Sequence, residues 1–420
     1  MITHIKINGF KSFLDFELDV PPFLALIGPN ASGKSNLFDA LTLVADVLEH
    51  GPAGALTRQE RGSALDMFHR FDDGTTVDRA TITVTALVGS LLSGGRYRIV
   101  VPMVCQIVLE KSDGQDPRFA EGFLRVVPSD ELTELPGRGN LDVRHFSFVH
   151  SYSDGRVLWT RDPKREVPVP PISLLSEGSQ PDRSILALMF RDECQSWRPH
   201  VLNPGLMRLP APAPDRSPLA SDGRNLAAVL FRLDDIGELW RLEADLIALI
   251  PGLKAVKPLL DKRRQEYDFD AVFAGTGAVL PRALSDGTLR ALALLAAAHD
   301  TVHQGVLAVE EIENGFHPGR VAELVRRLTR DLPGADGSGE PDSLRQVLVT
   351  SHSPALVSAL WERNPESLRF SEMVTRIDGS RKRSSRVTRV LPVRTDAATG
   401  TAATPWDVER FLGTVRAGDL

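Results

Sequence analysis

Residues 28–35 read Gly-Pro-Asn-Ala-Ser-Gly-Lys-Ser, and this stretch decides the fold class of the chain. The continuous apolar run Phe23–Ile27 precedes it, and a helical pattern with Leu37, Leu41 and Val44 on one face follows it. Glycines let backbone N–H groups curl around a phosphate, and the N-terminus of the next helix adds partial positive charge. Strand, G-x-x-x-x-G-K-[ST] turn and helix therefore predict an α/β protein that begins with a P-loop.

The P-loop pattern also assigns chemistry to its residues. The lysine of such a loop reaches the β- and γ-phosphates, and the serine hydroxyl ligates Mg²⁺, so ATP and Mg²⁺ are the expected cofactors. The residues expected on the nucleotide are Gly28, Asn30, Ser32, Gly33, Lys34, Ser35 and Asn36.

A second signal lies at the apolar run 306–309, which is followed by Glu310 and Glu311. Four apolar residues before two acids are typical of a central strand whose end meets the nucleotide. One carboxylate can hold Mg²⁺, and the next can polarise the attacking water. The sequence predicts Ser35 as a metal-binding residue, and it predicts that Glu310 and Glu311 share the metal-binding and catalytic roles.

Two further candidates each stand at the boundary of a predicted element. Ser285 precedes an apolar helix, where free N–H groups form another phosphate site. His352 follows the buried strand 347–349, where its ring can hydrogen-bond a γ-phosphate.

Composition limits the class of protein. The chain has 420 residues, of which 42% are apolar and 25% charged, as in globular proteins. Because the net charge is −6, binding to nucleic acid would need a local basic patch. Cys105 and Cys194 are too few for a disulfide framework, and no apolar stretch reaches the roughly 20 residues of a membrane helix. We expect a cytoplasmic protein without a membrane segment.

Taken in order, these motifs resemble an ABC-type ATPase head of the SMC, RecF and OLD kind. Four stretches carry further resemblance to this group or to its OLD-like members, and they are Ile7–Phe13, Asp222–Leu226, Asp286–Arg290 and Glu313–Pro318. The resemblance implies a P-loop NTPase with a β-rich subdomain and a compact helical insert. A long coiled coil is not expected, because residues 36–284 lack heptads and contain many prolines.

The resemblance also implies a mechanism, in which two heads enclose two nucleotides between them. Ser285 and Gly287 of one head then contact the γ-phosphate held by the other. Glu311 is the catalytic base, Glu310 takes the Mg²⁺ role, His352 senses the γ-phosphate, and Lys11 approaches the phosphates. The expected partners are a second copy of the chain, as a homodimer or larger homo-oligomer, and a separate nuclease or Toprim-like effector.

Three points depart from the family pattern. Glu310 stands where ABC proteins usually have Asp, so the roles of Glu310 and Glu311 could be exchanged. Asp286 replaces a glycine and brings a negative charge toward a phosphate. The glutamine loop is not placed, with Gln59 and Gln106 as candidates.

The predicted organisation divides the chain into an N-terminal part of the head (1–180), a helical insert (181–265), a C-terminal part of the head (266–395) and a tail (396–420). Residues 223–250 are helical by their apolar period. Too few residues follow His352 for a fused nuclease, so an anti-phage defence ATPase with a separate effector is expected. The alternatives are a RecF-like repair ATPase and an ATP-bound scaffold with little turnover.

Arginines and a lysine gather between residues 376 and 394 and could contact DNA or RNA phosphates. The alternative is a solvated hairpin turn. Unchanged DNA affinity and salt dependence after charge reversal of Arg381, Lys382 and Arg383 would exclude the nucleic-acid role.

Overall fold

The computed structural model describes residues 1–58, 62–91, 98–111, 117–127, 149–153, 156–159, 172–173, 185–302, 305–332, 344–379, 383–394, 402–404 and 408. Gln59, Arg381, Lys382 and most of the predicted tail lie outside these ranges. Within the described residues, no helix combines the length and the apolar composition needed to cross a bilayer.

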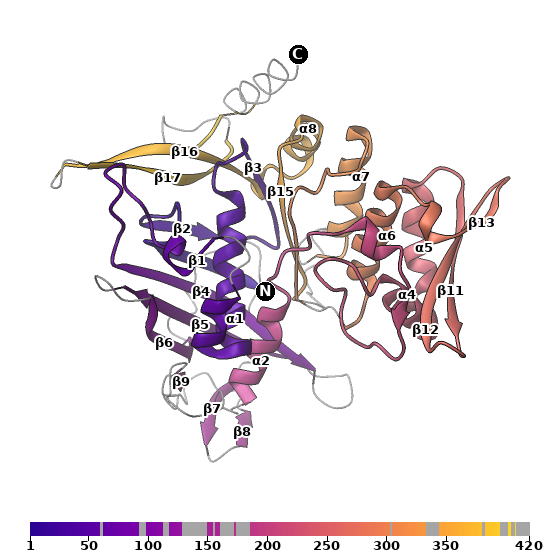
Figure 1. Ribbon diagram of the computed structural model, residues 1–420, viewed down its shortest axis with the longest axis horizontal. Helices are drawn as coiled ribbons and strands as arrows, with labels where there is room; N and C mark the ends of the chain where they lie inside the picture. The colour runs from indigo at the N-terminus through magenta and orange to yellow at the C-terminus, as the bar shows by residue number, and fades with distance from the viewer. Residues whose placement is uncertain are drawn as a thin grey trace.

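A five-stranded sheet in the order β14-β15-β3-β16-β17 forms the centre of the fold (Figure 1). The first four strands run parallel, and β17 runs antiparallel to β16. Its strands are β3 (Phe23–Ile27), β14 (Val306–Val309), β15 (Gln346–Ser351), β16 (Leu368–Asp378) and β17 (Arg383–Pro392). Every residue of β3, β14 and β15 is buried, as their apolar runs predict for strands covered on both faces.

Alternation along these strands feeds two hydrophobic cores. In β3, Ala25 and Ile27 point into one core, whereas Leu24 and Leu26 point into the other. The strands β14 and β15 divide their residues between the same two cores. The central sheet is therefore the shared wall between the N-terminal and C-terminal halves of the molecule.

The N-terminal core lies between the central sheet and a six-stranded antiparallel sheet, ordered β2-β1-β4-β5-β6-β9. Its elements are β1 (Ile2–Asn8), β2 (Phe16–Asp19), α1 (Lys34–Thr57), η1 (Ala64–Met67), β4 (Arg79–Leu91), β5 (Arg98–Glu110), β6 (Arg118–Val126), β9 (Ile172–Ser173) and α2 (Ile185–Gln195). The separate ribbon β7 (Val149–Ser153) and β8 (Arg156–Trp159) pairs only with itself.

Helices and a small sheet form the other half, at the opposite end of the molecule in Figure 1. The helices are α3 (Pro204–Met207), α4 (Leu226–Asp235), α5 (Leu239–Leu249), η4 (Pro281–Ala283), α6 (Asp286–His299), α7 (Pro318–Thr329), α8 (Pro354–Arg363) and η5 (Pro365–Ser367). The small sheet contains β10 (Ala211–Pro212), β11 (Leu253–Asp261), β12 (Glu266–Phe273) and β13 (Gly277–Val279).

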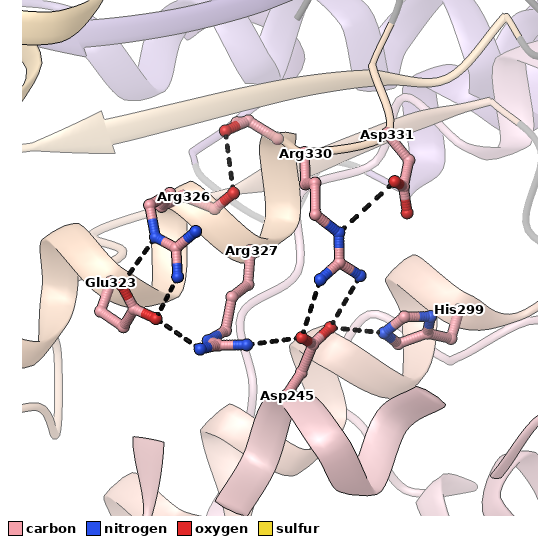
Figure 2. A network of polar contacts seen from close by, with 8 residues as sticks. Asp245, His299, Glu323, Arg326, Arg327, Arg330 and Asp331 are labelled. Carbon is pink, nitrogen blue, oxygen red and sulfur yellow. Dashed lines mark hydrogen bonds and ion pairs between the residues drawn. The ribbon is translucent and has the colours of Figure 1, made fainter. Parts of the chain in front are cut away.

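Buried charges join α5, α6 and α7 in this half (Figure 2). Asp245 of α5 is 2% exposed and contacts His299 of α6 at 2.8 Å and Arg327 of α7 at 2.6 Å. Arg330 approaches the same carboxylate at 3.1 Å, and Arg327 also contacts Glu323. The network fixes the end of α6 against α7.

The structure confirms the α/β class, and no long coiled coil occurs among the described residues. Residues 223–250 are largely helical, as predicted, but they form two helices, because the chain breaks between α4 and α5 at Gly237, whose φ is 73°. Two observations bear on the predicted domain boundaries. The limit at 265/266 falls in the hairpin between β11 and β12, and α2 packs into the N-terminal core.

Candidate functional site

The P-loop connects the buried strand β3 to α1, which begins at Lys34. A methyl group at Gly28 would lie 2.1 Å from the carbonyl oxygen of Ser371, so only glycine fits there. The Lys34 ammonium donates to the carbonyls of Gly28 and Pro29, both at 2.7 Å. Burial lowers the pKa of Lys34, although the nearby carboxylates, with Glu313 foremost, act in the opposite direction. The loop and its lysine are held as one compact unit.

Side chains from the C-terminal strands brace this loop. Ser371 of β16 and Thr388 of β17 both donate to the Ser32 carbonyl at 3.0 Å. The Thr388 hydroxyl also lies 2.6 Å from that of Ser12, which accepts from the Asn36 amide at 2.8 Å. Ser12, Ser371 and Thr388 were not predicted, since nothing in the local sequence pairs them with residues so distant in the chain.

The end of β14 brings the two predicted acids to the P-loop edge. The Ser35 hydroxyl lies 3.4 Å from Oε2 of Glu310. Glu311 has a φ of 50°, its N–H donates to the Thr350 hydroxyl at 2.9 Å, and its Oε2 accepts from the Asn314 amide at 2.6 Å. Glu310 therefore faces the P-loop serine, whereas Glu311 is turned toward the following loop.

His352 lies beyond the end of β15, next to a third acid. Its backbone N–H donates to Oε1 of Glu313 at 2.6 Å, and its Nδ1 lies 2.9 Å from the same oxygen. Sequence reasoning did not assign Glu313 to the site. The acidic stretch 310–313 and the resemblance carried by Glu313–Pro318 were the signals for it.

Residues 284–288, the serine loop that contains the predicted phosphate site at Ser285, lie at the start of α6. Ser285 is exposed and caps the helix by accepting from the Thr288 N–H at 3.2 Å. Asp286 is paired with the Arg208 guanidinium at 2.6 Å, which also donates to the Leu284 carbonyl. The charge that Asp286 brings to this helix end is therefore compensated within the chain.

Gly287 packs α6 closely against the loop that follows the acids. A methyl group there would lie 2.2 Å from the Gly315 carbonyl oxygen. The serine loop and the acidic loop of one chain thus touch through their backbones.

Lys11 donates to Asp39 of α1 at 2.6 Å. Both residues line a cavity of about 330 Å³ that also contains Glu310, Arg198 and Arg224. Lys11 therefore lines the same cavity as Glu310, the predicted metal-binding residue.

Of the two glutamine candidates, the structure describes only Gln106. Gln106 lies within β5 and donates to Thr83 on the neighbouring strand at 3.0 Å, and Gln59 is outside the described residues. Instead, His200 forms a parallel bridge with Val309, and Val201 lines the cavity beside Glu310. The segment around residue 200 occupies the edge of β14, which sequence reasoning missed.

The basic cluster is largely engaged within the chain. Arg376 pairs with Asp15, Arg383 with Asp378 and Arg389 with Glu372. Arg386 is exposed, and Arg381 and Lys382 lie outside the described residues. A nucleic-acid contact at this hairpin stays a prediction.

The side chains at the P-loop edge fit a nucleotide with Mg²⁺. Within the described residues, the Ser32 hydroxyl of the P-loop is buried without a hydrogen-bond partner, as expected where a phosphate completes the site. Mg²⁺ prefers oxygen ligands, and the Ser35 hydroxyl and Glu310 carboxylate supply them side by side.

A P-loop on a parallel strand, an acidic end of the sheet, a serine at a helix start and a histidine after the next strand define an ABC-type ATPase head of the SMC and RecF-like group. The chain belongs to the family described as "AAA domain, putative AbiEii toxin, Type IV TA system", whose model matches residues 23–92 and 187–358, more than half of the chain.

Curated relatives match shorter stretches. Structural maintenance of chromosomes protein 1 of Arabidopsis thaliana is 37% identical over 100 residues, which are 23% of this chain and 8% of that protein. The chromosome partition protein Smc of Methanocaldococcus jannaschii is 51% identical over 44 residues, 10% of this chain and 4% of that protein. This chain therefore spans only a small part of the length of these relatives.

Among solved structures, an Smc head bound to the C-terminal winged-helix domain of ScpA is similar to this chain. The alignment covers 92% of this chain and 98% of the chain in that structure. The sequence identity is 14% and the TM-score 0.49.

Proposed function

We propose that this protein binds and hydrolyses ATP, and that two copies assemble around the nucleotide. The observation that carries the proposal is the meeting of the P-loop with the acidic end of β14, where the Ser35 hydroxyl lies 3.4 Å from Glu310. Lys34, within the electrostatic field of Glu310, Glu311 and Glu313, supplies the positive charge for the phosphates.

The residues then divide the reaction between them. Lys34 and the loop N–H groups bind the β- and γ-phosphates, and Ser35 with Glu310 holds Mg²⁺, which neutralises phosphate charge when bound. Glu311 accepts the proton of the attacking water, and His352 contacts the γ-phosphate. Ser285 is exposed at the start of α6, which leaves it available to the nucleotide of a second copy.

Light scattering with and without Mg-ATP tests the assembly, with Glu311→Gln used to retain the nucleotide. We expect a monomer that becomes a dimer with ATP, normal ATP binding but no turnover in Glu311→Gln, and neither binding nor assembly in Lys34→Ala. Because Glu311 is turned toward Asn314, Glu310→Gln is the matched comparison. Full turnover in Glu311→Gln would reject Glu311 as the base, and an unchanged mass would reject assembly driven by ATP.

We also propose that the head acts with a separate effector protein in anti-phage defence. The family description supports this, because it names a toxin of a Type IV TA system. A nucleotide-driven dimer gives such an effector a surface that exists in only one nucleotide state.

A further inference from the structure

Residues 310–315, the acidic loop, include the carboxylate of Glu313, which contacts His352. One oxygen of Glu313 accepts the His352 backbone N–H at 2.6 Å and lies 2.9 Å from the ring Nδ1. A single atom thus constrains both the backbone and the ring of the same residue. The ring nitrogen left for another partner is Nε2.

Glu313 is largely buried and acts electrostatically on the P-loop lysine, Lys34. Its side chain is 11% exposed, and its second oxygen is buried without a hydrogen-bond partner among the described residues. Of the carboxylates that act on Lys34, Glu313 has the largest effect. A largely buried carboxylate is costly unless its oxygens are used, which argues against a role as surface charge.

Glu311 does not share this contact. Its Oε2 accepts from Asn314, and its N–H donates to Thr350. The two acids therefore have separate partners, although they are neighbours in the loop.

We propose that Glu313 is a positioning residue that holds His352 with Nε2 toward the γ-phosphate. The inference rests on the proposed ATPase function and assigns to a third acid the task of orienting the sensor. Fixing the ring before the nucleotide arrives removes an ordering cost from the reaction. A ring nitrogen bound to a carboxylate also determines which nitrogen faces the ligand.

The test is a double-mutant cycle of Glu313→Ala, His352→Ala and the combined variant, with Glu313→Gln as the conservative replacement. Affinity is measured by calorimetry with ADP and with a non-hydrolysable ATP analogue. The ratio of the affinity for the ATP analogue to the affinity for ADP measures the preference for the triphosphate. If Glu313 acts through His352, each single variant lowers this ratio by the same factor, on the order of tenfold, and the double variant lowers it no further. ADP affinity stays unchanged, and Glu313→Gln retains most of the preference because its amide oxygen can still accept both contacts.

Turnover gives the second readout. We expect Glu313→Ala and His352→Ala to lower kcat by a similar factor, about 10–100-fold, and to raise KM for ATP by about tenfold, in step with the loss of triphosphate affinity. The exposed Glu362→Ala on α8 is the control and should match the wild type.

Losses that multiply in the double variant would overturn the positioning role, as would an equal loss of ADP affinity, which marks a collapsed pocket. Failure of the proposed function looks different. In that case, the wild type itself shows no preference for the triphosphate and no turnover that depends on Lys34.

Discussion

At the scale of single residues, the pair of Asp286 and Arg208 decides the charge of the serine loop. The Arg208 guanidinium contacts Asp286 at 2.6 Å, at the helix start where the phosphate of a second copy is expected. We expect Arg208→Ala to weaken the ATP-driven dimer by about tenfold, because the carboxylate then repels that phosphate.

The matched variant is Arg208→Ala combined with Asp286→Asn, which removes both charges and should restore most of the affinity. Dimer dissociation constants from light scattering with Mg-ATP report the effect. A dimer of Arg208→Ala as tight as the wild-type dimer would show that this charge does not face the partner.

At the scale of elements, Asp245 holds α5, α6 and α7 together (Figure 2). Burial raises the pKa of Asp245, but hydrogen bonds from His299 and Arg327 outweigh it and leave the pKa below its ordinary value. Asp245→Ala should lower the free energy of unfolding by about 3–5 kcal/mol, because it leaves buried Arg327 without this partner. Urea unfolding at neutral pH measures the loss.

The contribution of Asp245 depends on pH with a definite sign. A lowered pKa means that the stabilisation is complete above the ordinary value of 3.8 and is lost as the pH falls through the lower value in the folded protein. The difference between wild type and Asp245→Ala should therefore shrink only in strong acid. Glu17→Ala, in the exposed pair with Lys6, is the control and should cost less than about 1 kcal/mol. An Asp245→Ala cost as small as that of Glu17→Ala would show that the network does not stabilise the fold.

At the scale of the whole molecule, the nucleotide site lies at the wall between two cores. The residues of β3, β14 and β15 alternate between those cores, so the site is anchored in both halves.

If the proposed defence role holds, phage should form fewer plaques on cells that express the chain from its native locus with flanking genes. Lys34→Ala should abolish protection while the protein level stays normal. Equal protection by Lys34→Ala would separate any defence role from ATP.

The local parts of the fold and site could be predicted from the sequence, because each depends on a short pattern. The apolar run before Gly28 predicted a buried strand, and Ser285 before an apolar helix predicted the start of α6. Long-range contacts could not be predicted. Periodicity shows that a residue is buried but does not identify its partner, so the contacts of Glu313 with His352 and of Arg208 with Asp286 remained hidden.

The bracing of the P-loop by the C-terminal strands has a consequence for synthesis on the ribosome. Thr388, which donates to the Ser32 carbonyl, is made 356 residues after it. A nascent chain exposes the complete P-loop sequence long before the strands that support it emerge. If the proposed ATP binding needs this bracing, full affinity for ATP is acquired only after β17 has emerged, and a chain truncated before β16 should bind ATP more weakly than the full chain.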